Sequence, residues 1–394
     1  MRRFAVIMAG GAGERFWPVS RRLRPKQLLR LTDPERSMIA EAIDRIAPLI
    51  PRENVLVATS EALGGAIAAA VPDLPRDNLI AEPAKRNTAA CLALAAAHVA
   101  ERRGPIDDVS IAVLTADHRI GEPERFRATV DAALSFAEGN DVLVTIGVMP
   151  TRPETGYGYI EVAADAEAAG ATGERGEGSE WAPEHPVPTS PAFGIDPDDL
   201  RVLPVARFRE KPDAATAAEW ARSGRHYWNS GMFFWRATSF LEGLARHMPE
   251  LARATDGMRA ALRAGDARPS DLRAIFEALA DVPIDVGLME RATNVHVVPA
   301  TFPWDDVGAW DALARSRPAD RDGNVVEGDA VLLGARDCVV YNDGGEEMAV
   351  AAIGVEGLIV VTTPDGVLVC SKERAQDVRR AVAEIRARGR DRLT

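Results

Sequence analysis

The sequence contains little lysine, few cysteines and no long apolar segment. Its 394 residues include 47 basic and 59 acidic side chains, which gives a formal net charge of −12. An acidic chain is poorly suited to non-specific binding of nucleic acid or of an anionic membrane surface. We therefore expect no nucleic-acid or membrane partner, and any phosphate ligand must be met by a local group of basic side chains.

Three cysteines exclude a disulfide framework and a cysteine-based metal site. Cys91, Cys338 and Cys370 lack metal-ligand spacing, and an odd number of thiols cannot pair completely. The longest apolar stretch, 89–100, is too short to span a bilayer. The apolar run near the N-terminus stops at Gly10, before a signal-peptide core develops. These absences predict a cytoplasmic protein with reduced thiols.

A glycine turn follows directly on the first apolar run. Residues 4–8 have the pattern of a buried strand, and Gly10, Gly11 and Gly13 come next. Because glycine has no Cβ, the backbone N–H groups of such a turn can approach phosphate oxygens. The turn lacks the third glycine of a dinucleotide fingerprint and the Lys-Ser/Thr of a P-loop. A glycine-rich turn without a ligand is the alternative interpretation.

Basic residues after the turn favour a nucleoside triphosphate site. Arg15 offers a guanidinium for bidentate phosphate contact, and Lys26, in Pro-Lys-Gln, offers a compact charge. Only four of the 47 basic residues are lysines. In such a chain a lysine is expected where a small ammonium is needed, which supports Lys26 and also Lys211.

Strand-like and helical segments alternate through the first half of the chain. Apolar runs at 55–58, 111–114 and 142–146 are typical of strands, and isoleucines at 39, 43, 46 and 50 mark one helix face. The alternation predicts an α/β fold, a Rossmann-like mixed and mostly parallel sheet that binds ligands at the carboxyl ends of its strands.

Composition divides the rest of the chain. Residues 163–199 are rich in Gly, Glu, Pro and Ser and predict a mobile surface insertion. Helices are expected at 214–222 and 240–262. Short β runs follow Pro318, and a final helix carries apolar residues at 378, 382 and 385. We therefore predict a large domain at 1–319 and a small β-rich domain at 320–394.

Aspartates indicate a metal site. Asp117 follows the strand at 111–114, whereas Asp305 and Asp306 lie far away in the sequence. If the fold joins Asp117 to one of them, their oxygens suit Mg²⁺ bound to phosphates. Alternatively, these aspartates merely cap a helix or a turn.

Two later segments offer polar groups for a sugar phosphate. Glu210 can accept hydroxyls beside the ammonium of Lys211, and the amide of Asn229 can both donate and accept. An exposed ion pair and an ordinary turn are the alternatives.

The order of these segments resembles the mannose-1-phosphate guanylyltransferases of the sugar-1-phosphate nucleotidyltransferase family, over essentially the whole chain. The motifs that carry the resemblance are AGGAGERFWPVSR with PKQ, EPAKRNTAA at 82–90, TADH at 115–118, TGYGYIE at 155–161, FREKPD at 208–213, WNSGMFFW at 228–235 and WDDVGAW at 304–310.

The resemblance implies transfer of GMP from GTP to mannose-1-phosphate, with Mg²⁺, by in-line attack at the α-phosphorus. It implies catalytic roles for Arg15 and Lys26 and metal binding by Asp117 and Asp306. It places the nucleotide at Gly10, Gly11, Gly13, Glu82, Asn87 and Thr88, and the sugar phosphate at Gly158, Glu210, Lys211 and Asn229.

The resemblance also implies that 320–394 form a left-handed β-helix used in a homodimer. Ala12, Glu14 and Ala90 depart from the family's usual Ser, Thr and Pro. Because the chain ends at Thr394, we expect no isomerase activity. Two alternatives stay open: the same fold using another hexose-1-phosphate and nucleotide, and a non-catalytic protein that senses a sugar nucleotide.

Overall fold

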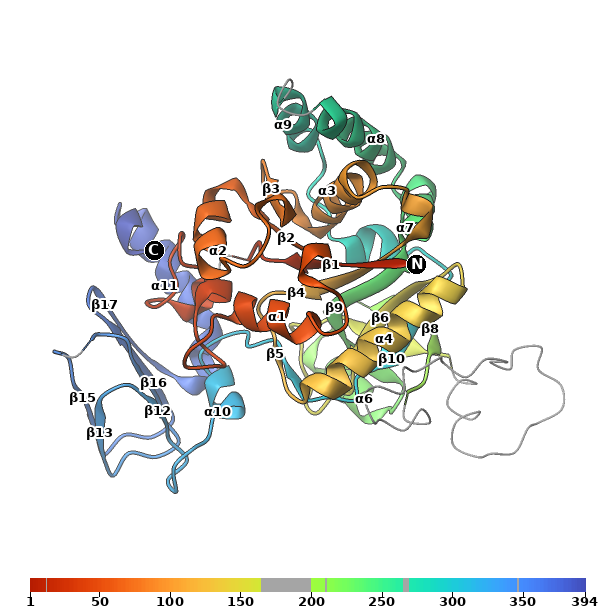
Figure 1. Cartoon of the computed structure of the whole chain (residues 1–394). Coiled ribbons are helices and arrows are strands. Elements are labelled where there is room, and N and C mark those ends of the chain that lie inside the picture. Colours follow the sequence, from red (N-terminus) through yellow and green to blue (C-terminus); the bar gives the residue numbers. More distant parts are fainter. Residues whose placement is uncertain (12, 164–199, 210, 265–268, 346) are drawn as a thin grey trace.

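The computed structural model describes residues 1–11, 13–163, 200–209, 211–264, 269–345 and 347–394. A nine-stranded sheet forms its centre, in the order β3-β2-β1-β4-β9-β6-β10-β8-β7 (Figure 1). All of these strands except β8 and β9 point in one direction. The strands are β1 (Arg2–Met8), β2 (Val55–Ser60), β3 (Leu79–Glu82), β4 (Val109–Thr115), β6 (Leu143–Val148), β7 (Tyr159–Val162), β8 (Leu203–Arg209), β9 (His226–Arg236) and β10 (Val295–Pro299).

Helices cover both faces of the sheet (Figure 1). Side chains of β1 point alternately to the two faces of the sheet, so two cores form. Phe4 and Val6 lie in one core with α3, α7 and α8. Ala5 and Ile7 lie in the other with α1, α2 and α4. The predicted α/β class and mixed, mostly parallel sheet are confirmed. The helices of this part are α1 (Met38–Ile46), α2 (Gly64–Ala70), α3 (Asn87–Arg102), α4 (Pro123–Gly139), α6 (Ala214–Arg222), α7 (Ala237–His247), α8 (Pro249–Ala264), α9 (Pro269–Glu277) and α10 (Ala312–Ser316).

Two predicted helices are wrong in their extent. The helix marked by isoleucines at 39, 43, 46 and 50 ends at Ile46, so Ile50 lies beyond it. The segment 240–262 forms two helices, because α7 ends at His247 and α8 begins at Pro249. Proline has no N–H for the helical ladder, and it fits best at the first position of a new helix. The predicted insertion at 163–199 lies, apart from residue 163, outside the described residues.

The C-terminal part is a short β-helix that ends in a helix. Strands β12, β14 and β16 pair in parallel, as do β13 and β15, and β17 closes one sheet in antiparallel pairing. Strand β15 was not predicted. The predicted apolar residues at 378, 382 and 385 lie on α11. These elements are β12 (Val325–Glu327), β13 (Ala330–Leu333), β14 (Val339–Asn342), β15 (Val350–Ile353), β16 (Leu358–Thr363), β17 (Gly366–Ser371) and α11 (Val378–Ala387).

A third core joins the two parts of the molecule. Phe16 and Trp17, which follow the glycine turn, pack in one cluster with Trp310 and with Tyr341 and Ile359 of the β-helix. The Phe16 and Trp310 rings meet edge to face, with centroids 5.1 Å apart. The glycine turn is therefore anchored on the junction between the sheet domain and the β-helix.

Candidate functional site

The glycine turn leaves β1 at the carboxyl edge of the sheet. Gly10 and Gly11 are exposed, and Gly13 has φ 61°. A Cβ built on Gly13 would lie 2.5 Å from the Cβ of Lys26. Glycine is therefore required at this position, both for its backbone conformation and for the close approach of Lys26.

Lys26 connects three distant segments. It is only 5% exposed, and its Nζ lies 3.0 Å from Asp117 Oδ2 and 2.5 Å from the carbonyl oxygen of Asp306. Arg15 reaches the same region, since its Nη1 donates to the Gly308 carbonyl at 2.9 Å. The structure thus brings together the predicted catalytic and metal-binding residues.

A small two-stranded sheet holds the two aspartates near each other. Strand β5 (Arg119–Ile120) pairs antiparallel with β11 (Trp304–Asp305), so the segment after β4 meets the segment around 306. Asp305 is turned to structural partners: it accepts from Val307 N at 2.7 Å and pairs with Arg315 Nε at 2.8 Å. Asp306 is the member of the pair that contacts Lys26, through its backbone carbonyl.

The two carboxylates suit Mg²⁺ that takes its other ligands from phosphate and water. Burial alone would raise the pKa of Asp117, but the charge and hydrogen bond of Lys26 outweigh it and hold that pKa below its usual value. Among the described residues there is no group of three or more His, Cys, Asp or Glu side chains able to hold a metal. Magnesium is commonly bound by one or two carboxylates plus substrate phosphates.

Tyr157 is a site residue that the sequence analysis missed. Its hydroxyl donates to Asp306 Oδ1 at 2.5 Å. Burial and the Asp306 charge raise the pKa of Tyr157, so the phenol stays a donor. Its place between glycines in the 155–158 motif was a signal, but only Gly158 was assigned a role.

His118 is the second residue missed. The Trp304 indole N–H donates to His118 Nδ1 at 3.1 Å, which leaves the ring proton on Nε2, 4.0 Å from Asp117 Oδ1. Burial lowers the pKa of His118, so the ring is neutral. His118 therefore lies beside Asp117 without adding a charge.

The predicted base-binding residues lie where β3 ends and α3 begins. Burial raises the pKa of Glu82 to about 6, against a lowering hydrogen bond from Cys91. Asn87 has φ 62°, and its Oδ1 accepts from Thr88 N at 2.9 Å. Thr88 Oγ1 accepts from Ile284 N at 2.8 Å. Asn87 and Thr88 therefore shape the turn, while Glu82 offers a carboxylate to the pocket.

A pocket of about 540 Å³ connects the glycine turn, Asp117 and the predicted base-binding segment. It runs from the glycine turn past Asp117 to the base segment and is also walled by α11. Its lining includes Gly10, Gly11, Glu14, Glu82, Asn87, Thr88, Thr115, Asp117, Val382, Arg386 and Thr394.

The predicted sugar residues fall on neighbouring strands. Asn229 N donates to the Gly158 carbonyl at 2.8 Å, and Asn229 Nδ2 donates to Asp285 Oδ1 at 2.6 Å. Burial raises the pKa of Asp285, which the sequence analysis did not single out. Lys211 is exposed and has φ 40°, whereas Glu210 lies outside the described residues.

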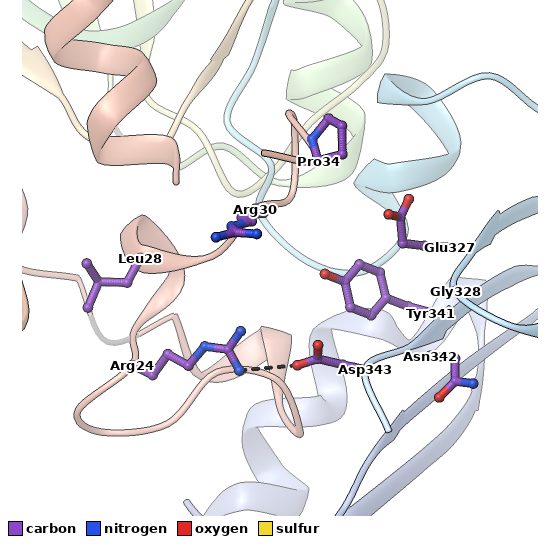
Figure 2. Close-up of a pocket in the computed structure, with 9 residues that line it drawn as sticks. All are labelled: Arg24, Leu28, Arg30, Pro34, Glu327, Gly328, Tyr341, Asn342 and Asp343. Carbon is purple, nitrogen blue, oxygen red and sulfur yellow. Dashed lines mark hydrogen bonds and ion pairs between the residues drawn. The ribbon is translucent and has the colours of Figure 1, made fainter. Parts of the chain in front are cut away.

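A second hollow, of about 520 Å³, lies between the segment 24–34 and the β-helix (Figure 2). Arg24 and Asp343 face each other across it, with Nη1 and Oδ2 3.1 Å apart. It contains neither the glycine turn nor the aspartate pair, so it is not the candidate site. Its lining residues are Arg24, Leu28, Arg30, Pro34, Glu327, Gly328, Tyr341, Asn342 and Asp343.

Within the described part of the chain, no helix has the length and apolar character needed to cross a bilayer.

Family models match almost the whole chain. A nucleotidyl transferase model matches residues 4–173 and 184–323, and a model of the mannose-phosphate isomerase/GMP-like β-helix domain matches 328–385.

Curated relatives are similar over nearly the same length. A mannose-1-phosphate guanylyltransferase of Escherichia coli is 38% identical over 381 residues, covering 96% of this chain and 72% of the relative. One from E. coli K12 is 36% identical, covering 98% and 74%. The xanthan biosynthesis protein XanB of Xanthomonas campestris pv. campestris is 34% identical, covering 99% and 74%.

Solved structures share the fold. A Thermus thermophilus protein, described as a mannose-1-phosphate geranyltransferase, superposes with a TM-score of 0.78 at 33% identity and covers 98% of this chain and 100% of that one. A Helicobacter pylori protein described as a mannose-6-phosphate isomerase, at 23% identity and a TM-score of 0.55, is similar in fold alone; it covers 77% of this chain and 100% of its own.

Proposed function

The chain belongs to the nucleotidyl transferase family, and from that premise we propose that it transfers GMP from GTP to mannose-1-phosphate. The products are GDP-mannose and pyrophosphate. Similarity to mannose-1-phosphate guanylyltransferases over nearly the full chain supports this substrate pair. The main structural support for this chemistry is the position of Lys26, which lies beside the glycine turn and contacts both Asp117 and Asp306.

The reaction joins two polyanions. A phosphate oxygen of mannose-1-phosphate attacks the α-phosphorus of GTP, a new P–O bond forms, and the bond to pyrophosphate breaks in line with it. The nucleophile is already anionic, so no general base is needed. Arg15 and Lys26 hold the phosphates together and offset charge as the transition state forms.

Asp117 and Asp306 would hold the metal. When bound, Mg²⁺ neutralises phosphate charge and orients the reacting groups. Tyr157 fixes one oxygen of Asp306 and leaves the other available. Lys26 keeps Asp117 ionised at neutral pH.

The carboxylate of Glu82 would select guanine over the other bases. Guanine presents two adjacent N–H donors, at N1 and N2, and an ionised carboxylate can accept both. Adenine offers an acceptor at N1, and uracil or thymine flanks its one N–H with carbonyl oxygens, so each fits a carboxylate less well. Gly10 lies next to Glu82, since a Cβ built there would be 3.7 Å from Glu82 Oε1.

Gly158, Lys211 and Asn229 would receive mannose-1-phosphate. The Gly158 backbone permits a close approach, Lys211 supplies a cation, and Asp285 fixes the Asn229 amide. The role of Glu210 stays a prediction.

We also propose a cytoplasmic homodimer. Three free cysteines support a reducing compartment. Large apolar side chains are exposed on the β-helix, among them Leu333 and Ile353, which are paired in register on β13 and β15 at 56% and 65% exposure. A second copy of the chain would cover this apolar surface.

Pyrophosphate release tests the reaction. The purified protein with Mg²⁺ would be given GTP, UTP, dTTP or ATP, each with mannose-1-phosphate or glucose-1-phosphate. Release confined largely to GTP with mannose-1-phosphate is expected. A different preferred pair would replace the substrate assignment, and tight GDP-mannose binding without release would favour a sensor.

A further inference from the structure

The turn proposed to bind a triphosphate carries a carboxylate of its own. Glu14 opens the short helix η1 (Glu14–Phe16) immediately after Gly13, and its side chain is 34% exposed. It lines the same pocket as Gly10, Gly11 and Asp117. An unpaired negative charge at this place would repel a ligand with three or four negative charges.

A residue 372 positions later in the chain supplies the opposite charge. Arg386, on α11, donates through Nη1 to Glu14 Oε1. Its Nε donates to Thr394 Oγ1 at 3.0 Å, which fixes the guanidinium from its other side. Arg386 and Thr394 both line the pocket, so the C-terminal part forms one of its walls.

Packing contacts fix the position of the C-terminal helix α11 relative to the glycine turn. Helix α11 contacts η1, and Val382, one turn before Arg386, is buried in the third core with Phe16 and Trp17. The Trp17 indole N–H donates to the Leu393 carbonyl at 2.7 Å. The pairing of Glu14 with Arg386 is therefore supported on both sides by buried contacts, unlike an isolated surface ion pair.

We propose that Arg386 is a positioning residue for the nucleotide: it cancels the charge of Glu14, so that the glycine turn can receive the triphosphate. This proposal rests on the proposed function. It makes the β-helix part of the nucleotide site, in addition to any role in assembly.

The test compares Arg386→Ala, Glu14→Gln and the double variant with the unchanged enzyme. Arg386→Ala leaves Glu14 unpaired, so KM for GTP should rise about tenfold while kcat and KM for mannose-1-phosphate stay within about twofold. In the double variant no carboxylate is left to repel the triphosphate, so KM for GTP should return to within about twofold of the original. Arg386→Lys should keep most of the affinity.

Arg388→Ala is the matched control. Arg388 follows the end of α11, its side chain is 69% exposed, and it pairs with Glu384 of the same helix. This variant should behave like the unchanged enzyme. Melting temperatures of all variants separate a local effect from unfolding, and the Arg386→Lys and Glu14→Gln variants keep the test open if Arg386→Ala fails to fold.

Two results would overturn the proposal: an unchanged KM for GTP in Arg386→Ala, or a double variant as impaired as Arg386→Ala alone. The dissociation constant of GTP, measured by titration without sugar phosphate, gives the same comparison without turnover. A failure of the proposed reaction is therefore distinguishable from a failure of this inference.

Discussion

Lys26 is held on three sides, by Gly13 behind it and by Asp117 and Asp306 at its tip. Its position follows from local sequence, because the Pro-Lys-Gln segment comes shortly after the glycine turn. The resemblance to the family implied that Asp117 and Asp306 join Lys26, whereas the sequence by itself left that pairing open. It could not predict Tyr157 and His118, because their value comes from partners that only the fold brings within hydrogen-bond distance.

Replacing Lys26 by alanine should lower kcat by about two to three decades, since one lost charge-assisted contact costs about 2 to 4 kcal/mol in the transition state. Steady-state pyrophosphate release measures the effect. Lys372→Ala is the control, because Lys372 pairs with Asp337 and does not line the pocket of the candidate site. Near-normal turnover of the Lys26 variant would remove this residue from the mechanism.

The raised pKa of Glu82 predicts that nucleotide binding depends on pH. Burial raises its pKa to about 6, and only the ionised form can accept both guanine N–H groups. Protonation as the pH falls through 6 should therefore weaken binding, raising KM for GTP about tenfold between about pH 7 and about pH 5.

Glu82→Gln is the matched control for that profile, because protonation of GTP itself affects both proteins equally. The ratio of KM for GTP in Glu82→Gln to KM for GTP in the unchanged enzyme should change with pH around the pKa of Glu82. A constant ratio from about pH 5 to about pH 8 would show that the Glu82 charge does not contribute to binding.

Tyr157→Phe should raise the Mg²⁺ concentration needed for half-maximal activity about tenfold, because groups that orient a metal ligand typically carry an effect of this size. Removing the hydroxyl frees Asp306 Oδ1 to rotate. A Mg²⁺ titration of initial rates measures the change. Tyr341→Phe, in the hollow of Figure 2, removes a hydroxyl elsewhere and should leave the titration unchanged.

At the scale of elements, periodicity predicted only part of the sheet and only some of its covering helices. The isoleucine stripe of α1 and the apolar runs of β1, β2, β4 and β6 are strong local signals. Strands β3, β7, β9 and β10 of the sheet, the break between α7 and α8, and the short strand β15 were not predicted. A helical apolar pattern continues across Pro249, and a four-residue strand of valine, isoleucine and alanine has little pattern to read.

The glycine turn offers a test of element geometry. Gly13→Ala places a Cβ 2.5 Å from Lys26 at a positive φ, so we expect a loss of about 2 to 4 kcal/mol in the free energy of unfolding together with lower activity. Urea denaturation measures it. Gly65→Ala is the control: the site lies in α2 with open space around it, and alanine there should be neutral or stabilising. Equal stability of the two variants would contradict the constraint on Gly13.

For the whole molecule, Leu333→Glu with Ile353→Glu should convert the proposed dimer to a monomer, because two charges on adjacent strands oppose burial of this surface. Sedimentation equilibrium measures the mass. Arg321→Glu, at a side chain 93% exposed, is the control. An unchanged mass for the double variant would place the interface elsewhere.

The third core also limits how the two parts of the chain can be exchanged between related proteins. Phe16 and Trp17, next to the nucleotide turn, are packed together with Trp310, Tyr341 and Ile359. A recombination event that exchanged only the β-helix would leave these aromatic rings without their partners, and it would disturb the turn that they support. Exchange of the β-helix alone should therefore weaken the nucleotide turn unless the packing partners of Phe16 and Trp17 are kept.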